Sequence, residues 1–226
     1  MNSQADNSKR FFIKTLGCKV NQYESQAMRE ILLRAGFKEC LARDIADIYI
    51  LNTCTVTNRA DKESRYWLGF FHKANPKAKI VVTGCYVERD SNDISFLPGI
   101  AHIIKNDEKN RIAEILTNAN PVAQYPMPTA QGPYNPLTIT DFKNHTKAFV
   151  KIQDGCENCC SYCKVPLVRG PLRSRPVTDI LKEVKILVEK GFKEIVLTGV
   201  CLGAWGKDPY TKAILDSWPG GKGLGL

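Results

Sequence analysis

Three cysteines of this chain stand at the ends of apolar segments that have the composition of β-strands. The segments are 10–17 (RFFIKTLG), 47–52 (DIYILN) and 79–83 (KIVVT), and they lead to Cys18, Cys54 and Cys85. Helix-like segments separate them, so the order β-α-β-α-β predicts an α/β fold with a parallel sheet and helices on its faces. The carboxyl ends of parallel strands open on one edge of a sheet, where ligands bind. We therefore expect the three thiols to converge there.

The alternative for these cysteines is that each is a small buried apolar side chain, as free cysteine often is. Three thiols in equivalent positions favour a ligand set instead, whereas Cys40 has no such position and is expected to be structural. The spacing predicts helices over 21–35, 58–75 and 107–117 and a fourth strand over 100–104. Asn21 and Glu24 have the spacing of a capping box at the start of the first helix.

A second cysteine set lies in the segment 154–169, DGCENCCSYCKVPLVR. Cys156, Cys160 and Cys163 have the spacing C-x3-C-x2-C, and Cys159 lies between them. Three thiolates on a short loop can bind three irons of a cubane cluster and leave the fourth iron open. A zinc site and purely structural thiols are the alternatives. The two C-x2-C pairs, Cys156 with Cys159 and Cys160 with Cys163, follow one another directly. Zinc sites generally need a longer stretch of chain between the pairs, so that the second pair can complete a tetrahedral site.

Composition shifts divide the chain into segments. We expect a disordered N-terminus at 1–9, a first domain at 10–118 and a proline-rich linker at 119–146 with a short hairpin near 137–139. From 147 the pattern predicts a strand (147–153), a helix (178–190) and a strand (194–200), the opening βαβ unit of a barrel-like domain. The helix is expected to bury one apolar face, formed by Ile180, Leu181, Val184, Leu187 and Val188.

Charge and cysteine content limit the classes of function. The formal net charge of +9 favours a nucleic-acid partner or a solvated basic surface. No apolar run reaches the roughly 20 residues of a membrane span, and residues 1–10 lack the apolar core of a signal peptide. We therefore expect a cytoplasmic protein without a membrane partner, in which nine cysteines indicate metal or redox chemistry rather than disulfides. Arg169, Arg173 and Arg175 either neutralise a carboxylate or phosphates, or form a solvated turn.

Four segments together resemble the radical S-adenosylmethionine tRNA methylthiotransferases: TLGCKVNQYES (15–25), LNTCTVTNRADKESR (51–65), VVTGCYVER (81–89) and KIQDGCENCCSYCKVPLVRG (151–170). The resemblance covers about residues 10–208. KVNQYES and TVTNRAD are similar to the branch that acts on N6-threonylcarbamoyladenosine at tRNA position 37, the MtaB type. The isopentenyladenosine branch and the ribosomal-protein aspartate branch are the alternatives.

The resemblance implies two [4Fe-4S] clusters. Cys156, Cys160 and Cys163 match the ligands of the radical cluster, whose open iron binds S-adenosylmethionine, and Cys18, Cys54 and Cys85 match the ligands of an auxiliary cluster that carries the sulfur to be donated. Tyr162 matches the aromatic position near the adenine of S-adenosylmethionine, and we expect Arg169 in the same vicinity. Cys201 stands where the family more often has a polar residue, and Cys159 has no assigned role.

The resemblance also implies the reaction. S-adenosylmethionine supplies a methyl group and a 5′-deoxyadenosyl radical, and a methylthio group is added to C2 of the adenine in an anticodon loop, with a low-potential electron donor as partner. The match stops near residue 208, so 147–208 is expected to be an incomplete radical S-adenosylmethionine domain and 209–226 an unmatched tail. We therefore expect an incomplete copy, and an inert cluster-binding fragment is a further alternative.

Overall fold

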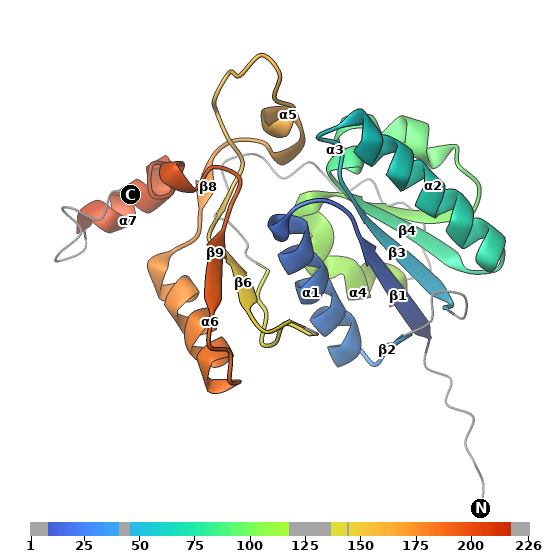
Figure 1. Cartoon of the computed structure of the whole chain (residues 1–226), viewed down its shortest axis with the longest axis horizontal. Coiled ribbons are helices and arrows are strands. Elements are labelled where there is room, and N and C mark those ends of the chain that lie inside the picture. The colour runs from blue at the N-terminus through green and yellow to red at the C-terminus, as the bar shows by residue number, and fades with distance from the viewer. Residues whose placement is uncertain (1–8, 41–45, 118–136, 144, 218–226) are drawn as a thin grey trace, which may run out of the picture.

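The computed structural model describes residues 9–40, 46–117, 137–143 and 145–217. Its first half is a five-stranded, fully parallel sheet in the order β2-β1-β3-β4-β5 (Figure 1). The strands are β1 (Arg10–Thr15), β2 (Lys38–Glu39), β3 (Ile48–Thr53), β4 (Lys79–Gly84) and β5 (Ile100–Ile104). The helices between and after them are α1 (Lys19–Arg34), α2 (Asn58–Ala74), α3 (Cys85–Ser95), the 3-10 helix η1 (Asn106–Arg111) and α4 (Ile112–Thr117). The predicted parallel α/β sheet is confirmed.

Helices cover both faces of this sheet because its strands are apolar on both sides. In β3, Ile48 and Ile50 pack with the residues of α1 and α4, whereas Tyr49 and Leu51 pack with those of α2 and α3. Such alternation within a fully buried strand is typical of parallel sheets. Central strands β1, β3 and β4 are in continuous register, with Ile13 opposite Ile50. This register brings the carboxyl ends of the three strands to the same edge.

The second half is smaller and starts with β6 (Ala148–Lys151), which pairs in parallel with β9 (Ile195–Thr198). Between them lie β7 (Gln153–Asp154), α5 (Val165–Arg169), β8 (Arg173–Ser174) and α6 (Val177–Glu189). The 3-10 helix η2 (Leu202–Ala204) and α7 (Pro209–Ser217) follow β9. The predicted βαβ unit is therefore present, and α7 is a helix that the sequence pattern did not predict.

Helix α1 belongs to the cores of both halves (Figure 1). Met28 and Leu32 pack against the five-stranded sheet, while Tyr23 and Ala27 pack with the apolar residues of the second half. The Glu30 carboxylate accepts backbone N–H groups of residues 140 and 141 and thereby fixes the segment 137–143 on α1. Segment 137–143 forms no strand, so the expected hairpin near 137–139 is wrong. Residues 119–136 and 144 of the predicted linker lie outside the described residues, as do 1–8 and 218–226.

Several local predictions need correction. The N-cap residue of α1 is Cys18, without a side-chain cap, so the capping box of Asn21 and Glu24 is wrong. Leu181 and Val188 on α6 are more than half exposed, because this part of the apolar face is only partly covered, while Ile180 and Leu187 are buried as expected. Within the described residues, no helix is long and apolar enough to cross a membrane.

Candidate iron–sulfur site

The three strand-end cysteines lie where helices begin. Cys18 precedes the first residue of α1, Cys85 is the first residue of α3, and Cys54 follows β3 shortly before the start of α2. Backbone N–H groups at a helix N-terminus point outward without partners and favour negative charge nearby. Cys18 and Cys85 therefore lie at positions suited to a negatively charged group.

These thiols also lie near one another. A Cβ atom added to Gly17 would stand 2.8 Å from the Cys54 Sγ, which places the residue before Cys18 directly against Cys54. Burial raises the pKa of the Cys54 thiol, and the neighbouring Cys85 and Cys18 thiols raise it further. Cys54 and Cys85 are buried, and Cys18 is exposed. The group is therefore enclosed by protein on one side and open at Cys18.

The chemical type of these side chains suits a predicted iron–sulfur cluster. No three ligating side chains among the described residues are placed to bind one common metal ion. A cubane distributes its thiolates over separate irons, so its three ligands stand farther apart than three ligands of one ion. Thiolate ligands are also the type that iron–sulfur clusters require. The three thiols at this edge are ligands of this type.

The second cysteine set lies on a loop between β7 and α5 that is anchored at its base. The Gln153 side chain donates to the backbone carbonyls of Asp154 and Gly155 at 2.7 Å each, and the N–H of Cys156 donates to the Gly170 carbonyl at 3.1 Å. At Gly155, φ is +71° and an added Cβ would stand 1.8 Å from the Pro171 carbonyl oxygen, so only glycine fits. The loop therefore leaves β7 in one fixed direction.

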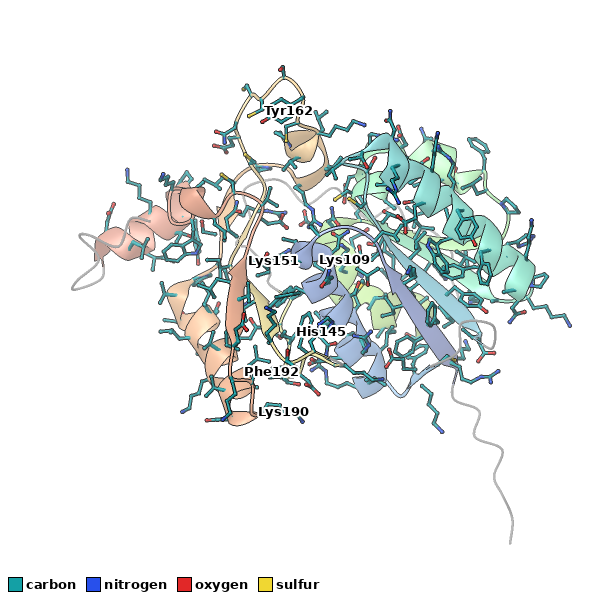
Figure 2. The ribbon with its side chains drawn as sticks, in the orientation of Figure 1. Lys109, His145, Lys151, Tyr162, Lys190 and Phe192 are labelled. Atoms are coloured by element: carbon teal, nitrogen blue, oxygen red, sulfur yellow. The ribbon has the colours of Figure 1, made fainter. Side chains whose placement is uncertain are left out.

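Toward its tip the loop is open to solvent. Cys159 and Cys160 are exposed, and Cys156 and Cys163 are partly buried. Tyr162 is 88% exposed and projects from the end of the loop, away from the rest of the chain (Figure 2). Its predicted place near the adenine of S-adenosylmethionine stays a prediction. The loop carries its three predicted ligands, Cys156, Cys160 and Cys163, on one short stretch.

Between the two cysteine sets lies a buried group of five charged side chains, which we call the interdomain ion cluster: Glu24, Lys109, Lys151, Asp154 and Arg169. Glu24 pairs with Lys109, with Lys151 at 2.8 Å and with Arg169 at 2.5 Å. Asp154 pairs with Lys151 at 2.8 Å and with Arg169 at 3.4 Å. Lys109 and Lys151 come from the two halves of the molecule (Figure 2), and both pair with Glu24. All five side chains are buried.

The charges of this cluster depend on one another. Burial alone would raise the pKa of Glu24, but Arg169, Lys109 and Lys151 outweigh it and hold that pKa well below its ordinary value. The pKa of Asp154 is also lowered, since Lys151 and Arg169 outweigh its burial. Burial would lower the pKa of Arg169, but the two carboxylates raise it well above its ordinary value. Both acids are therefore ionised and the guanidinium is charged.

Arg169 also contacts a predicted cluster ligand of the other half. Its Nε lies 3.3 Å from the Sγ of Cys85, and its Nη2 donates to the Asn21 side chain. The predicted role of Arg169 near S-adenosylmethionine stays a prediction. Within the described residues, the side chain instead links α5, the helix that follows the cysteine loop, to a thiol at the strand edge.

The other two arginines likewise bind carboxylates of the chain itself. Arg173 pairs with Asp107 at 2.8 Å, and Arg175 pairs with Glu183 and donates to the Tyr23 hydroxyl at 3.1 Å. The alternative that Arg169, Arg173 and Arg175 form a solvated turn is therefore wrong. Sequence reasoning missed Glu24, Lys109, Lys151 and Asp154 as site residues, because nothing in their local pattern distinguishes a buried charge from a surface charge.

The three remaining cysteines have different surroundings. Cys40 is buried in the core on the α2 side of the sheet, which agrees with a structural role. The backbone N–H of Cys201 donates to the Gln153 Oε1 at 2.7 Å, so β9 is fixed to the base of the loop. Cys159 is exposed, and its Sγ lies 3.9 Å from the Glu157 carbonyl oxygen.

Comparisons with known proteins identify two domains. Residues 10–104 match the uncharacterized protein family UPF0004, and residues 150–206 match the radical SAM superfamily. The threonylcarbamoyladenosine tRNA methylthiotransferase MtaB of Bacillus subtilis is 37% identical over 198 residues, which are 86% of this chain and 44% of that protein. The tRNA-2-methylthio-N(6)-dimethylallyladenosine synthase of Thermodesulfovibrio yellowstonii is 38% identical over 202 residues, 83% of this chain and 44% of that protein.

The chain thus spans about half the length of the curated relatives it matches. Among solved structures, the radical S-adenosylmethionine methyltransferase TsrM from Kitasatospora setae matches with a TM-score of 0.55 at 12% identity, over 92% of this chain and 50% of that one. At this identity the likeness concerns the fold alone. It supports the placement of the two halves in one α/β architecture.

Proposed function

Because this chain carries UPF0004 and radical SAM domains and is related by sequence to the MtaB methylthiotransferases, we propose that it acts in methylthio transfer to tRNA. The proposed product carries a methylthio group at C2 of N6-threonylcarbamoyladenosine at position 37. The observation that carries the proposal is the pair of three-cysteine sets, one at the sheet edge and one on the loop, with Arg169 of the helix after the loop in contact with Cys85. A single set would suit many radical enzymes, whereas the second set provides a separate place for the sulfur.

The radical SAM domain supports S-adenosylmethionine and an iron–sulfur cluster as cofactors. We assign Cys156, Cys160 and Cys163 to the cluster that binds S-adenosylmethionine. We assign a second cluster to the strand-end set, Cys18, Cys54 and Cys85. When bound, these groups would supply the electron, the radical, the sulfur and the methyl group, because no side-chain acid or base can activate an aromatic C–H bond.

The chain's own residues would position these groups and the substrate. The strand ends hold Cys54 and Cys85 in a buried environment, which limits access of water to a sulfur bound there. The net charge of +9 favours the phosphates of a tRNA. An anticodon loop presents unstacked bases, so adenosine 37 is accessible to a protein without opening a duplex.

The first experiment measures iron after anaerobic reconstitution of the chain. We expect about eight irons per chain from two cubanes and about four in either triple Cys→Ala variant, one in each set. Cys159→Ala is the matched control, because it lies in the same loop and is not an assigned ligand, and it should keep about eight. Zinc without iron in the wild-type chain would rule out the proposal.

The second experiment separates the roles of the two sets by using dithionite and S-adenosylmethionine. Cys160→Ala should abolish formation of 5′-deoxyadenosine, while Cys54→Ala should retain it and lose methylthio transfer. Relatives named for threonylcarbamoyladenosine and for dimethylallyladenosine have similar sequence identity to this chain, so identity alone does not choose the substrate. Nucleoside analysis of tRNA by mass spectrometry then identifies which modified adenosine receives the methylthio group. A methylthio group found on dimethylallyladenosine alone would overturn the proposed substrate.

A second candidate is a cluster-binding chain without turnover. The exposed apolar side chains of the second half favour it, since Leu181, Val188 and Leu197 are 58%, 55% and 45% exposed. A substrate pocket that excludes water needs such side chains to be covered. Iron bound in full with no 5′-deoxyadenosine formed would support this candidate over the first.

A further inference from the structure

The side chain of Arg169 is held in one orientation by groups from both halves of the molecule. One terminal nitrogen lies 2.5 Å from Glu24 and 3.4 Å from Asp154, and the other donates to Asn21. With both terminal nitrogens held in this way, the Nε–H points at the Cys85 Sγ, 3.3 Å away. A planar guanidinium fixed at two corners cannot turn its third donor elsewhere. The contact with sulfur therefore follows from the ion pairs.

Basic side chains outnumber carboxylates in the interdomain ion cluster. The interdomain ion cluster contains three cations, Lys109, Lys151 and Arg169, and two carboxylates, Glu24 and Asp154. These groups are buried, and an uncompensated charge away from water is strongly unfavourable. An anionic cluster bound at the strand edge would add negative charge beside Arg169, whose Nε already contacts the Cys85 Sγ.

We propose that Arg169 is a positioning residue that donates a charged hydrogen bond to Cys85 and so raises the reduction potential of the cluster bound at the strand edge. This inference rests on the proposed function, because it needs that cluster. Hydrogen bonds to ligating sulfurs stabilise the more negative, reduced state of an iron–sulfur cluster. Arg169 lies in the second half and Cys85 in the first, so the potential depends on the packing of α5 against α3.

The test uses a parent variant in which Cys156, Cys160 and Cys163 are replaced by Ala, so that only the strand-edge cluster is observed. Arg169→Met in this parent should lower the reduction potential, measured by redox titration followed by EPR. We expect about a tenfold change in the ratio of oxidised to reduced cluster at a fixed potential, about 59 mV for a one-electron couple. Arg173→Met is the matched control, because Arg173 also bridges the halves, through Asp107, and should leave the potential unchanged.

Arg169→Lys keeps the inference testable if Arg169→Met does not fold or bind iron. Lysine retains the charge beside Glu24, but a single ammonium cannot hold Glu24, Asn21 and Cys85 together, so the potential should fall between those of the parent and Arg169→Met. Pulsed EPR with ¹⁵N-labelled arginine should show a nitrogen coupling in the parent and in Arg173→Met that is lost in Arg169→Met.

The outcomes separate this inference from the proposed function. A parent that binds no iron overturns the proposed strand-edge cluster, and the inference fails with it. A parent that binds iron, with Arg169 variants that titrate at its potential, overturns the inference and leaves the proposed function standing. A lowered potential in the Arg169 variants, with Arg173→Met unchanged, supports both.

Discussion

Replacing Glu24 with Gln should destabilise the protein more than any other single charge removal on α1. The Glu24 carboxylate pairs with Lys109, Lys151 and Arg169 and is buried. Glutamine keeps the shape of the side chain but has no charge, so Asp154 is the one carboxylate of the interdomain ion cluster that remains to compensate its three cations. The net positive charge of the interdomain ion cluster rises from one to two as a result.

The magnitude follows from that burial. Removing one partner of a buried ion pair costs about 3–5 kcal/mol, because the other charge stays buried without compensation. For a domain of this size, about 4 kcal/mol corresponds to a fall of roughly 8–16 °C in the midpoint of thermal unfolding. By contrast, Glu194→Gln breaks a surface pair with Lys147, in which both side chains are about half exposed. That control should change the free energy of unfolding by about 0–1 kcal/mol.

The assay is thermal and urea unfolding of four chains: wild type, Glu24→Gln, Lys109→Met and the double variant. In the double variant the cluster returns to one excess positive charge, so Lys109→Met should recover part of the stability that Glu24→Gln loses. We expect a coupling energy of about 0.5–3 kcal/mol between the two substitutions. Glu24→Gln within about 1 kcal/mol of the wild type, or additive effects in the double variant, would refute the buried-charge argument.

Three further predictions concern pH, a turn and a helix cap. The pKa values of Glu24 and Asp154 are lowered in the folded protein. The two ionised carboxylates therefore stabilise the fold fully at pH values above their ordinary pKa values, about 4, and this stabilisation is lost as the pH falls through the lowered values. The urea concentration at the unfolding midpoint should decrease when the pH is taken below about 4, and it should decrease less in Glu24→Gln. Gly155→Ala should lower the free energy of unfolding by at least about 3 kcal/mol, because the added Cβ would overlap the carbonyl of residue 171. Gly191 also has a positive φ but has open space around it, so Gly191→Ala should lower the free energy of unfolding by only about 1–2 kcal/mol in the same assay. Thr57→Ala removes the acceptor for the N–H of residue 60 at the start of α2 and should lower the unfolding free energy by about 1 kcal/mol.

The sheet and its cysteines could be predicted from the sequence because they depend on local patterns. Apolar runs of strand length that each end at a cysteine indicate both the parallel order and the edge at which Cys18, Cys54 and Cys85 lie, and the structure agrees with that order. The helix over residues 178–190 was predicted nearly to its observed ends, Val177–Glu189. These features need no knowledge of what packs against them.

The ion cluster could not be predicted, because its members come from five separate elements. Glu24 lies on α1 with the spacing of a helix cap, and that reading is reasonable for an isolated helix. Its real partners, Lys109 and Lys151, are 85 and 127 residues away in the chain. Likewise, Leu181 lies on an apolar stripe of α6 but is exposed, because periodicity shows which residues share a face and not whether another element covers it.

The double role of α1 has a consequence for where this protein can be divided. Family matches and the proline-rich stretch both suggest a boundary between residues 104 and 150. A chain that ended there would expose one side of α1 to solvent, because Tyr23 and Ala27 would lose the apolar side chains that pack against them. Glu24 would also lose Lys151 and Arg169 as ion-pair partners. The sequence matches two families, but both halves pack on α1, so the second half completes the apolar surroundings of a helix of the first.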